Sequence, residues 1–386
     1  MSTPLDGIVV ADFTRVLAGP LATMTLADLG ADVVKVERPG LGDDTRRWGP
    51  PWTEHASSYF ECVNRSKQSI TLDLRSGSDL ALARALVARA DVLVENFLTG
   101  TMERLGLGYS EMSALNPRLV YCSITGFGSE AGAELPGYDF VVQALGGLMS
   151  ITGDPDGEPT KAGVALVDVL TGKDATIGIL AALQERERSG MGQRIEVNLL
   201  SSLLGSLANQ AGAFLATGTS PGPLGNRHPS IAPYETLHCR DGALAVACGN
   251  DGQFRRLAAA LGMPGLAADA QFATNAARVA NRAALVAVLE GALCTDDTGV
   301  WVKALTDAGI PAGQVGDIGS ALDLAHGLGL EPTLDVGPDN PRQVRHPITY
   351  SRSTLRTPTA PPVLGEHNDE VRSWLAQPAT RHTQGE

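Results

Sequence analysis

Short apolar runs alternate with helical patterns along the first 125 residues, and this alternation restricts the possible folds more than any other feature of the sequence. Strands separated by helices pair in parallel, because each helix returns the chain to the starting end of the sheet. The sequence therefore predicts an α/β fold whose large domain is a doubly wound, Rossmann-like sheet with helices on both faces. The predicted strands are residues 8–13, 32–37, 70–74, 91–94 and 119–125, and the predicted helices are residues 18–29 and 79–90.

The chain changes character after residue 216. One more strand at residues 194–197 and an apolar helical stretch at residues 199–215 precede a segment rich in Gly, Pro and Ser, which is typical of a linker. We expect a large domain over residues 1–216, a linker over 217–229 and a smaller α+β domain over 230–330. In the smaller domain we predict a hairpin of residues 235–239 and 243–248, and helices at residues 253–261, 282–293 and 297–308.

Composition excludes several classes of protein. The net charge of −13 argues against binding to nucleic acid or to an acidic membrane surface, since both need clustered Lys and Arg. The five cysteines show no CxxC pairing and the seven histidines no ligand spacing, so we expect neither a disulfide framework nor a metal site. No apolar run approaches the roughly 20 residues of a membrane span, and the first ten residues lack the features of a signal peptide. These observations predict a cytoplasmic protein.

The first strand-to-helix turn, residues 14–20, carries one glycine and one proline. A dinucleotide-binding fold would have G-x-G-x-x-G at this place, so a nicotinamide enzyme is disfavoured. Glu37 nevertheless stands where such folds keep an acid for the ribose hydroxyls, and it keeps a dehydrogenase open as an alternative. The loop at residues 38–51 contains three arginines among Gly and Pro residues, and loops of this kind carry function more often than structure.

One carboxylate, Asp168, separates two apolar segments of the sequence. Residues 163–167 read as a short buried strand and residues 169–183 as a helix, so Asp168 is predicted at a helix N-terminus. An acid at this place is most often an N-cap that accepts bonds from backbone N–H groups. The local sequence by itself does not separate this structural role from a catalytic one.

An ordered set of segments runs through most of the chain: FTRVLAGP (13–20), LADLGADVVKVERPG (26–40), NRSKQSITLDL (64–74), DVLVENF (91–97), RLGLGY (104–109), PGYDFVVQALGGLMSITG (136–153), GNRHPSIAPYE (225–235), GIPAGQV (309–315) and PPVLGEHNDEV (361–371). This set resembles the class III coenzyme A transferases of the CaiB/BaiF type, which include formyl-CoA and carnitine CoA transferases. The resemblance implies an acyl-CoA donor and a carboxylic acid acceptor, with no permanently bound cofactor. It also implies that residues 331–386 return to the large domain, so that the smaller domain is inserted, and that two chains interlock as a homodimer.

The resemblance assigns roles to individual residues. The Asp that matches Asp168 is the covalent nucleophile of the family, and a carboxylate can attack a thioester to form a mixed anhydride. Arg15 precedes the first turn, where it could contact an acceptor carboxylate or face solvent. The residues expected to lie along CoA are Val16, Leu17 and Ala18 near the thioester, Arg38 near the adenine and phosphates, Leu72, Asn96, Phe97 and Arg104 along the nucleotide and pantetheine, and Tyr138.

Two alternatives stay beside the transferase. A racemase branch of the same fold exchanges a proton alpha to the thioester and has a histidine at the position of Tyr138, whereas a tyrosine hydroxyl is a poor general base near neutral pH. A non-catalytic acyl-CoA-binding relative is the other alternative, and Asp168 argues against it. Leu17, where the formyl-specific branch has glutamine, argues against a formyl or oxalyl substrate. Residues 249–253 are either a mobile loop over the site or the N-cap of the next helix.

Overall fold

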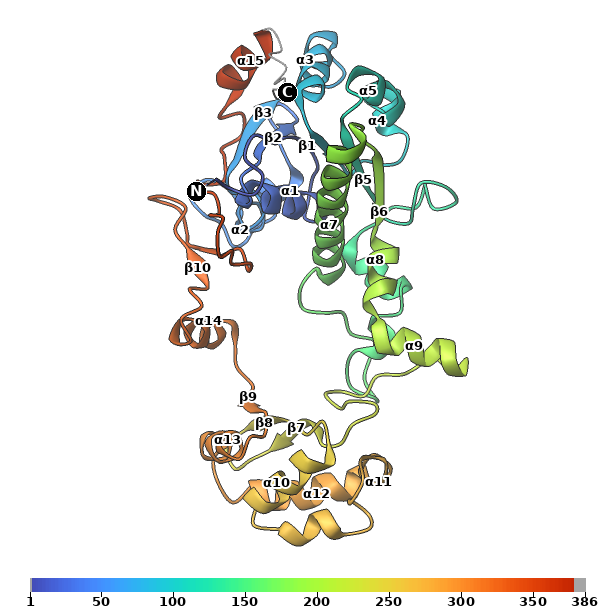
Figure 1. Ribbon diagram of the computed structural model, residues 1–386, viewed down its shortest axis with the longest axis vertical. Coiled ribbons are helices and arrows are strands. Elements are labelled where there is room, and N and C mark those ends of the chain that lie inside the picture. The colour runs from blue at the N-terminus through green and yellow to red at the C-terminus, as the bar shows by residue number, and fades with distance from the viewer. Residues whose placement is uncertain (1, 378–386) are drawn as a thin grey trace. The chain divides into compact units, whose positions relative to one another are not determined.

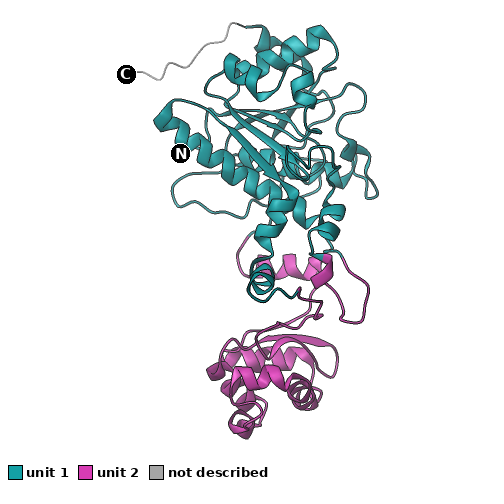
Figure 2. Cartoon of the chain, turned by 90° about the vertical axis from the view of Figure 1, so that its right-hand side faces the viewer, with its two compact units in different colours: residues 1–148, 161–219, 331–386 teal, residues 149–160, 220–330 magenta. Residues whose placement is uncertain are grey.

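The structure is a computed structural model that describes residues 2–377, and its contacts divide the chain into two compact units. The first unit combines the chain up to Leu148, Lys161–Thr219 and the chain from Glu331 (teal in Figure 2). The second unit is formed by Met149–Thr160 and Ser220–Leu330 (magenta in Figure 2). The passage at Thr219 falls within the segment predicted as a linker, whereas the assignment of residues 149–160 to the second unit has no counterpart in the sequence prediction.

The first unit is built on a six-stranded parallel sheet (Figure 1). The order β3-β2-β1-β4-β5-β6 means that the chain winds from the centre to one edge and then from the centre to the other. This sheet confirms the parallel α/β fold predicted from the alternation of strands and helices. The strands are β1 (Val9–Phe13), β2 (Asp32–Glu37), β3 (Lys67–Thr71), β4 (Val92–Glu95), β5 (Val120–Thr125) and β6 (Arg194–Asn198).

The strands of this sheet are apolar on both faces. Val10 and Val92 belong to the core on one face, and their neighbours Ala11 and Leu93 belong to the core on the other. Because side chains alternate across a strand, helices must cover both faces to bury them. The first face packs against α1 (Ala18–Asp28), α6 (Asp139–Leu145), α7 (Leu166–Ser189) and α8 (Leu199–Ser206), and the second against α3 (Gly77–Arg89), α4 (Thr101–Arg104), α5 (Tyr109–Leu115) and α15 (Asn368–Ala376).

The C-terminal stretch is tied to the first unit by buried contacts. Arg65 donates to both carboxylate oxygens of Asp28 (2.9 and 2.6 Å) and to the carbonyl of Val344 (3.1 Å). The side chain of Asn368, at the start of α15, accepts a bond from the backbone N–H of Thr71 at 2.8 Å. The short antiparallel pair β10 (Thr333–Leu334) and β11 (Gln343–Val344) lies in this stretch, and the connecting segments of the unit contain η1 (Asp44–Arg47), α2 (Ser58–Glu61) and α9 (Ala208–Thr217).

The second unit has its own antiparallel sheet of β7 (Tyr234–His238), β8 (Ala243–Ala247) and β9 (Ala312–Gln314). The pairing of β7 with β8 confirms the predicted hairpin. The side chain of Asn250 accepts a bond from the N–H of Gln253 at 2.9 Å, so Asn250 is the N-cap of α10 and residues 251–253 are its first turn. The other elements are η2 (Met149–Ile151), α10 (Asp251–Ala260), η3 (Pro264–Ala268), α11 (Asn275–Ala280), α12 (Arg282–Leu293), α13 (Thr298–Asp307) and α14 (Ile318–Gly327).

Three local predictions are wrong. Residues 163–167 form no strand: Val164 is 62% exposed, and the segment leads directly into α7 without pairing to the sheet. Residues 348–351 also predict a short strand, but this segment is irregular, and its side chains, such as Ile348, are exposed and face no neighbouring strand. The helical stretch at residues 199–215 is two helices, α8 and α9, bent by 80° at a break where Ala208 takes a positive φ of 44°.

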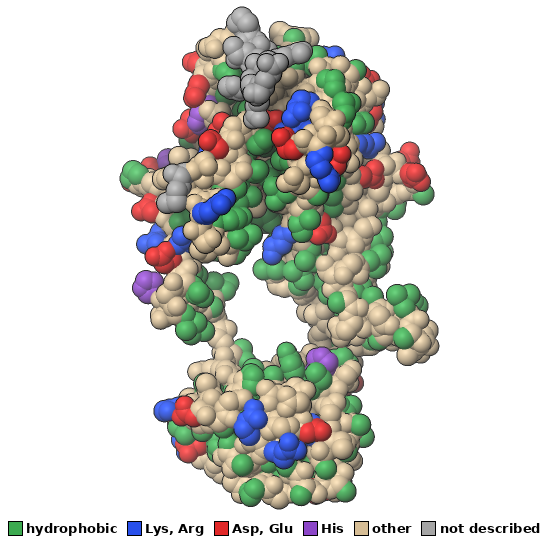
Figure 3. Space-filling view, in the orientation of Figure 1, with side chains coloured by type: hydrophobic (Ala, Val, Ile, Leu, Met, Phe, Trp, Pro, Cys, Tyr) green, Lys and Arg blue, Asp and Glu red, His purple; other side chains and the backbone are tan. Residues whose placement is uncertain are grey.

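No single helix within residues 2–377 is long and apolar enough to cross a membrane, although the bent pair α8 and α9 together has the required length and hydropathy. On the face drawn in Figure 3, acidic and basic side chains are interspersed, and Lys and Arg do not gather into one continuous patch.

Candidate active site

The centre of the sheet offers the place where ligands bind in folds of this kind. The chain leaves β1 toward one edge and leaves β4 toward the other, and the crevice outside the carboxyl ends of two such strands is the usual ligand site. The turn after β1 and the segment after β4 meet there and line two adjoining pockets of about 350 and 580 Å³. Arg15 and Phe97 line both pockets, so the two cavities share a wall.

The smaller pocket contains one carboxylate and one cationic side chain, and its walls are apolar and rich in glycine. Among the residues that the structure describes, Asp168 is its only carboxylate and Arg15 its only positively charged residue. Tyr138, which is 58% exposed, also lines it. Gly126 and Gly137 form part of its wall and lie so close that a Cβ on Gly137 would be 2.3 Å from the Cα of Gly126.

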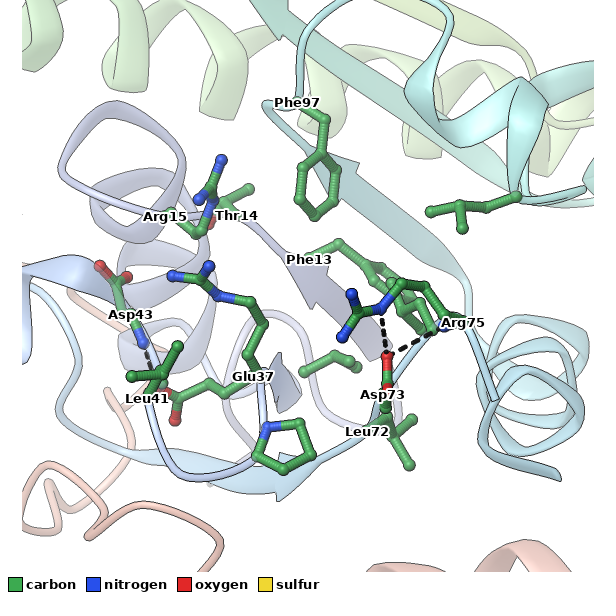
Figure 4. A pocket seen from close by; sticks show the side chains of 16 residues that line it. Phe13, Thr14, Arg15, Glu37, Leu41, Asp43, Leu72, Asp73, Arg75 and Phe97 are labelled. Atoms are coloured by element: carbon green, nitrogen blue, oxygen red, sulfur yellow. Dashed lines mark hydrogen bonds and ion pairs between the residues drawn. The ribbon is translucent and has the colours of Figure 1, made fainter. Parts of the chain in front are cut away.

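The larger pocket contains the arginine-bearing loop that follows β2. Figure 4 shows Arg15 and Phe97 on one side of this pocket and Asp73 and Arg75 on another. Arg38, from the loop, also lines it and donates to Asp44 at 2.8 Å. The pocket is mainly apolar, with cationic side chains at its rim that can bind phosphate groups.

The structure brings most of the predicted site residues together. Arg104 lines neither pocket: it is exposed at the end of α4 and donates to Thr101 Oγ1 at 2.8 Å, which holds its side chain along its own helix. The neighbouring Leu105 lines the larger pocket instead. The predicted residues in the smaller pocket are Val16, Leu17, Ala18, Asn96, Phe97, Tyr138 and Asp168, and those in the larger pocket are Arg38, Leu72 and Phe97.

Buried charges hold the turn after β1. Asp12 accepts bonds from the N–H of Thr14 (2.9 Å) and from its hydroxyl (2.5 Å), while Lys35 donates to the Thr14 carbonyl (2.9 Å) and to Asp43 (3.0 Å). Burial opposes the charge of Asp12, yet the surrounding lysines lower its pKa to about 2. Val16 has a φ of 70°, an unfavourable value for a β-branched residue, and its N–H donates to Asp43. The network therefore maintains a strained turn at the pocket wall.

Asn96 also binds the turn that carries Arg15. Its side-chain oxygen accepts from the N–H of Arg15 (2.9 Å), and its side-chain nitrogen donates to the carbonyl of Arg15 (2.7 Å). Both polar groups of the amide are thus used on one residue of the turn. Asn96 lines the smaller pocket and also fixes the backbone of Arg15.

Asp168 lies in the first turn of α7, as predicted, but it is not the N-cap. Ala165 occupies the cap position, and the carboxylate of Asp139 in α6 accepts from the N–H groups of Val167 (2.7 Å) and Asp168 (3.2 Å). The Asp168 carboxyl group itself makes no side-chain hydrogen bond or ion pair within residues 2–377. Burial raises the pKa of Asp168 to about 7, and the negative charge of Asp139 adds to the effect.

Two residues that interact with Asp168 or its helix were not predicted. Asp139 directly follows Tyr138 at the start of a helical pattern, a signal that could have marked it as a capping acid. Tyr59, from α2, has a pKa raised to about 12 by burial and then by the charge of Asp168, so its hydroxyl stays protonated within electrostatic reach of that carboxylate. No local pattern in the sequence marks Tyr59.

The free backbone N–H groups of the site belong to α1 and not to α7. The N–H groups of Val167 and Asp168 are bound by Asp139, and that of Val169 donates to Ala165 at 3.1 Å. A helix N-terminus beside a carboxylate nucleophile would be expected to serve nearby oxyanions as well, but these N–H groups of α7 are already bonded. The N–H groups of Leu17 and Ala18, at the start of α1, make no hydrogen bond within the described residues, and both residues line the smaller pocket.

Glu37 does not present a free carboxylate for a ribose. It is buried and accepts bonds from Arg46 (2.7 and 2.8 Å), from Ser69 (2.7 Å) and from the N–H of Asp43 (2.9 Å). Its role is to anchor the arginine-bearing loop. Across residues 2–377, no group of three His, Cys, Asp or Glu residues is arranged to hold a metal ion.

Comparison with known proteins places this site in a family. The chain is 44% identical to succinate–glutarate CoA-transferase of Agrobacterium fabrum, over 96% of each chain, and 37% identical to human succinyl-CoA:glutarate CoA-transferase, over 95% of this chain and 85% of that one. Acetyl-CoA:oxalate CoA-transferase of Acetobacter aceti is 43% identical over 83% of each chain. The crystal structure of a CaiB/BaiF family protein from Brucella suis matches with a TM-score of 0.87 and 46% identity, over 97% of this chain and all of that one.

The model of CoA-transferase family III matches residues 5–368, which include both pockets and all the residues predicted for the site. The chain therefore belongs to CoA-transferase family III and is an enzyme of this class.

Proposed function

We propose that this enzyme moves CoA from an acyl-CoA donor to a free carboxylic acid through covalent intermediates on Asp168. The observation that carries the proposal is the position of this carboxylate in the pocket together with its raised pKa. It is the only acid that lines the smaller pocket in the described part of the chain, and its pKa is raised to about 7. A carboxylate that is poorly solvated and unpaired is more basic, and so more nucleophilic, than an ordinary one.

The proposed exchange conserves atoms and charge at each step. Asp168 attacks the thioester carbonyl and the C–S bond breaks. CoA leaves as a thiolate, and the donor acyl group stays on Asp168 as a mixed anhydride. The thiolate attacks the aspartyl carbonyl and releases the donor acid, which leaves an aspartyl-CoA thioester. The acceptor carboxylate attacks this thioester, and the freed thiolate then takes the acceptor acyl group and restores Asp168. These reaction steps need no electron carrier and no resident cofactor.

The start of α1 supplies the electrostatic part of this mechanism. Each attack on a carbonyl creates an oxyanion, and backbone N–H groups at a helix N-terminus stabilise such a charge. The unpaired N–H groups of Leu17 and Ala18 border the same pocket as Asp168 and are our candidates for this role. Removing one donor of this kind typically costs about 10²–10³ in rate.

We further propose that CoA lies across both pockets, with its nucleotide in the larger one near Arg38 and Leu72 and its thioester in the smaller one. The shared wall of Arg15 and Phe97 leaves the pantetheine a path between them. The names of several relatives include succinate or succinyl-CoA and glutarate, so dicarboxylic acids of this length are our first candidates for donor and acceptor, whereas Leu17 argues against oxalate. We place the enzyme in the cytoplasm as a homodimer, without a nucleic-acid or membrane partner.

The nucleophile can be tested with one variant and its control. Asp168→Asn should abolish CoA transfer, because an amide cannot form the anhydride, while Asp174→Asn, an exposed change on the same helix, should retain it. Wild-type enzyme incubated with succinyl-CoA and then trapped with hydroxylamine should carry the modification on Asp168 in mass spectrometry. Transfer at the wild-type rate by freshly purified Asp168→Asn enzyme, shown by mass to be free of deamidation, would refute the mechanism.

A further inference from the structure

We propose that Arg15 recognises the second carboxylate of a dicarboxylic substrate while the first carboxylate reacts at Asp168. This inference deepens the proposed function and rests on it. A free carboxylate that enters a small apolar pocket loses its hydration, and this loss is repaid only by a cation or several hydrogen-bond donors. Arg15 is the only positively charged residue lining the smaller pocket within residues 2–377, and it shares that pocket with Asp168.

The turn that carries Arg15 is held by hydrogen bonds from outside the turn. Asn96 binds both the N–H and the carbonyl of Arg15, and the strained residue that follows is held by Asp43. The guanidinium carbon lies 5.2 Å from the centre of the Phe97 ring, close enough for a cation–π contact. A cation fixed in this way binds an anion with little further loss of conformational freedom.

The guanidinium group has an unused edge. Its Nη1 lies 3.3 Å from an oxygen of Asp44, in a partly exposed pair that also serves Arg38. Its Nε is buried and has no hydrogen-bond partner, and Nη2 makes no hydrogen bond within the described residues either. Nε and Nη2 together form a fork that binds a carboxylate through two parallel hydrogen bonds. A buried N–H without a partner is rare in folded proteins, and a substrate carboxylate would satisfy this one.

The phosphates of CoA are the other anions that could reach Arg15, since this residue also borders the larger pocket. That pocket has Arg38 and Arg75 of its own, whereas the smaller pocket has no second cation among the described residues. We therefore assign Arg15 to the acyl group and not to the nucleotide. The two assignments differ in one measurable respect: only the first makes Arg15 responsible for the choice between acids.

The first experiment uses the wild-type enzyme alone. Glutarate, its monoamide and pentanoate have similar lengths but differ in the second charge, and they compete for CoA from one donor, succinyl-CoA. We expect kcat/KM for glutarate to exceed that for either neutral-ended acid by on the order of 100-fold, since the fork would be left unpaired by the others. Equal use of the three acids would overturn the inference and leave the proposed function standing, whereas no transfer to any acid would count against the proposed function itself.

The second experiment tests whether Arg15 is the residue that causes the preference for dicarboxylic acids. Arg15→Gln should reduce the preference for glutarate over its monoamide to within about threefold, and Arg15→Lys, which keeps the charge but not the fork, should retain part of it. Arg38→Gln is the matched control, because it removes the other arginine bound to Asp44: it should raise KM for the acyl-CoA without changing the preference among acids. An unchanged preference in a folded Arg15→Gln variant, with a raised KM for every acyl-CoA, would assign Arg15 to a phosphate and overturn the inference. If Arg15→Gln does not fold, the Arg15→Lys variant and the wild-type competition decide.

Discussion

At the scale of the residue, the burial that makes Asp168 our proposed nucleophile should also lower the stability of the protein. Its pKa is raised to about 7 in the folded state, from an ordinary value of about 4. The folded protein therefore binds this proton more tightly than the unfolded chain does, so the stability linked to Asp168 is present at low pH and is lost as the pH rises from about 4 to about 7. Activity should follow the opposite trend, because only the charged carboxylate is a nucleophile.

We predict that Asp168→Asn is more stable than the wild type at pH 8, because the amide carries no charge to desolvate or to repel Asp139. Three pKa units limit the gain to at most about 4 kcal/mol in the free energy of unfolding, and the gain should disappear near pH 4. Urea unfolding between pH 4 and 8 measures it, with Asp174→Asn as the control that shows no such trend. A loss of stability at pH 8 would mean that the carboxylate is structural.

At the scale of the element, the contact between α1 and α7 sets the geometry of the site. Gly172 lies about one turn beyond Asp168, and a Cβ on it would be 2.6 Å from the carbonyl oxygen of Ala18. The two helix backbones therefore approach as closely as a glycine allows. This approach brings the start of α1, with its unpaired N–H groups, and the start of α7 to one pocket.

We predict that Gly172→Ala destabilises the first unit by about 1–3 kcal/mol and lowers kcat, since the added methyl group must push the helices apart. Gly291→Ala in α12 is the control: nothing lies within 4 Å of its Cβ position, so the change should stabilise the helix by about 0.5–1 kcal/mol. Chemical unfolding and steady-state kinetics of both variants compare the two positions. Equal behaviour of the two alanine variants would show that the contact does not constrain the site.

At the scale of the whole molecule, the proposed homodimer has a physical basis in the first unit. Leu145 of α6 is 70% exposed and Leu215 of α9 is 82% exposed. Phe140 of α6, Leu204 of α8 and Phe214 of α9 are also exposed. Exposed large apolar side chains that gather on neighbouring elements are typical of interfaces. Interlocked chains would in addition be unable to separate without unfolding.

We therefore predict a dimer that does not dissociate when it is diluted. Light scattering and mass photometry from micromolar to nanomolar concentration should give the dimer mass throughout, with activity proportional to enzyme concentration. A dimer mass that falls on dilution would indicate an ordinary, open interface. A stable and fully active monomer would exclude the interlocked arrangement.

The sequence by itself determined the strands of the large sheet, most of the helices predicted between them and the order of these elements. Residues 32–37 and 282–293 form the predicted strand and helix to the residue, and the first turn of the long helix contains Asp168 as expected. These features depend on apolar periodicity and on turn residues a few positions apart, which a single sequence displays. The ordered motifs likewise indicated the family, and most of the residues they marked line the two pockets.

Only the tertiary structure decided how those residues are used. Asp139 caps the helix of Asp168 from 28 residues away, Asn96 binds the backbone of Arg15 across 81 positions, and Glu37 is taken by Arg46 and not left free for a ligand. Arg104, although part of a motif, lines neither pocket and binds Thr101 of its own helix. Such pairings arise when the sheet brings distant segments together, and the competition among donors and acceptors at that point is settled by packing and burial. No local sequence pattern shows which donor binds which acceptor, because each of these residues is equally compatible with its own strand, helix or turn whether or not the distant partner is present.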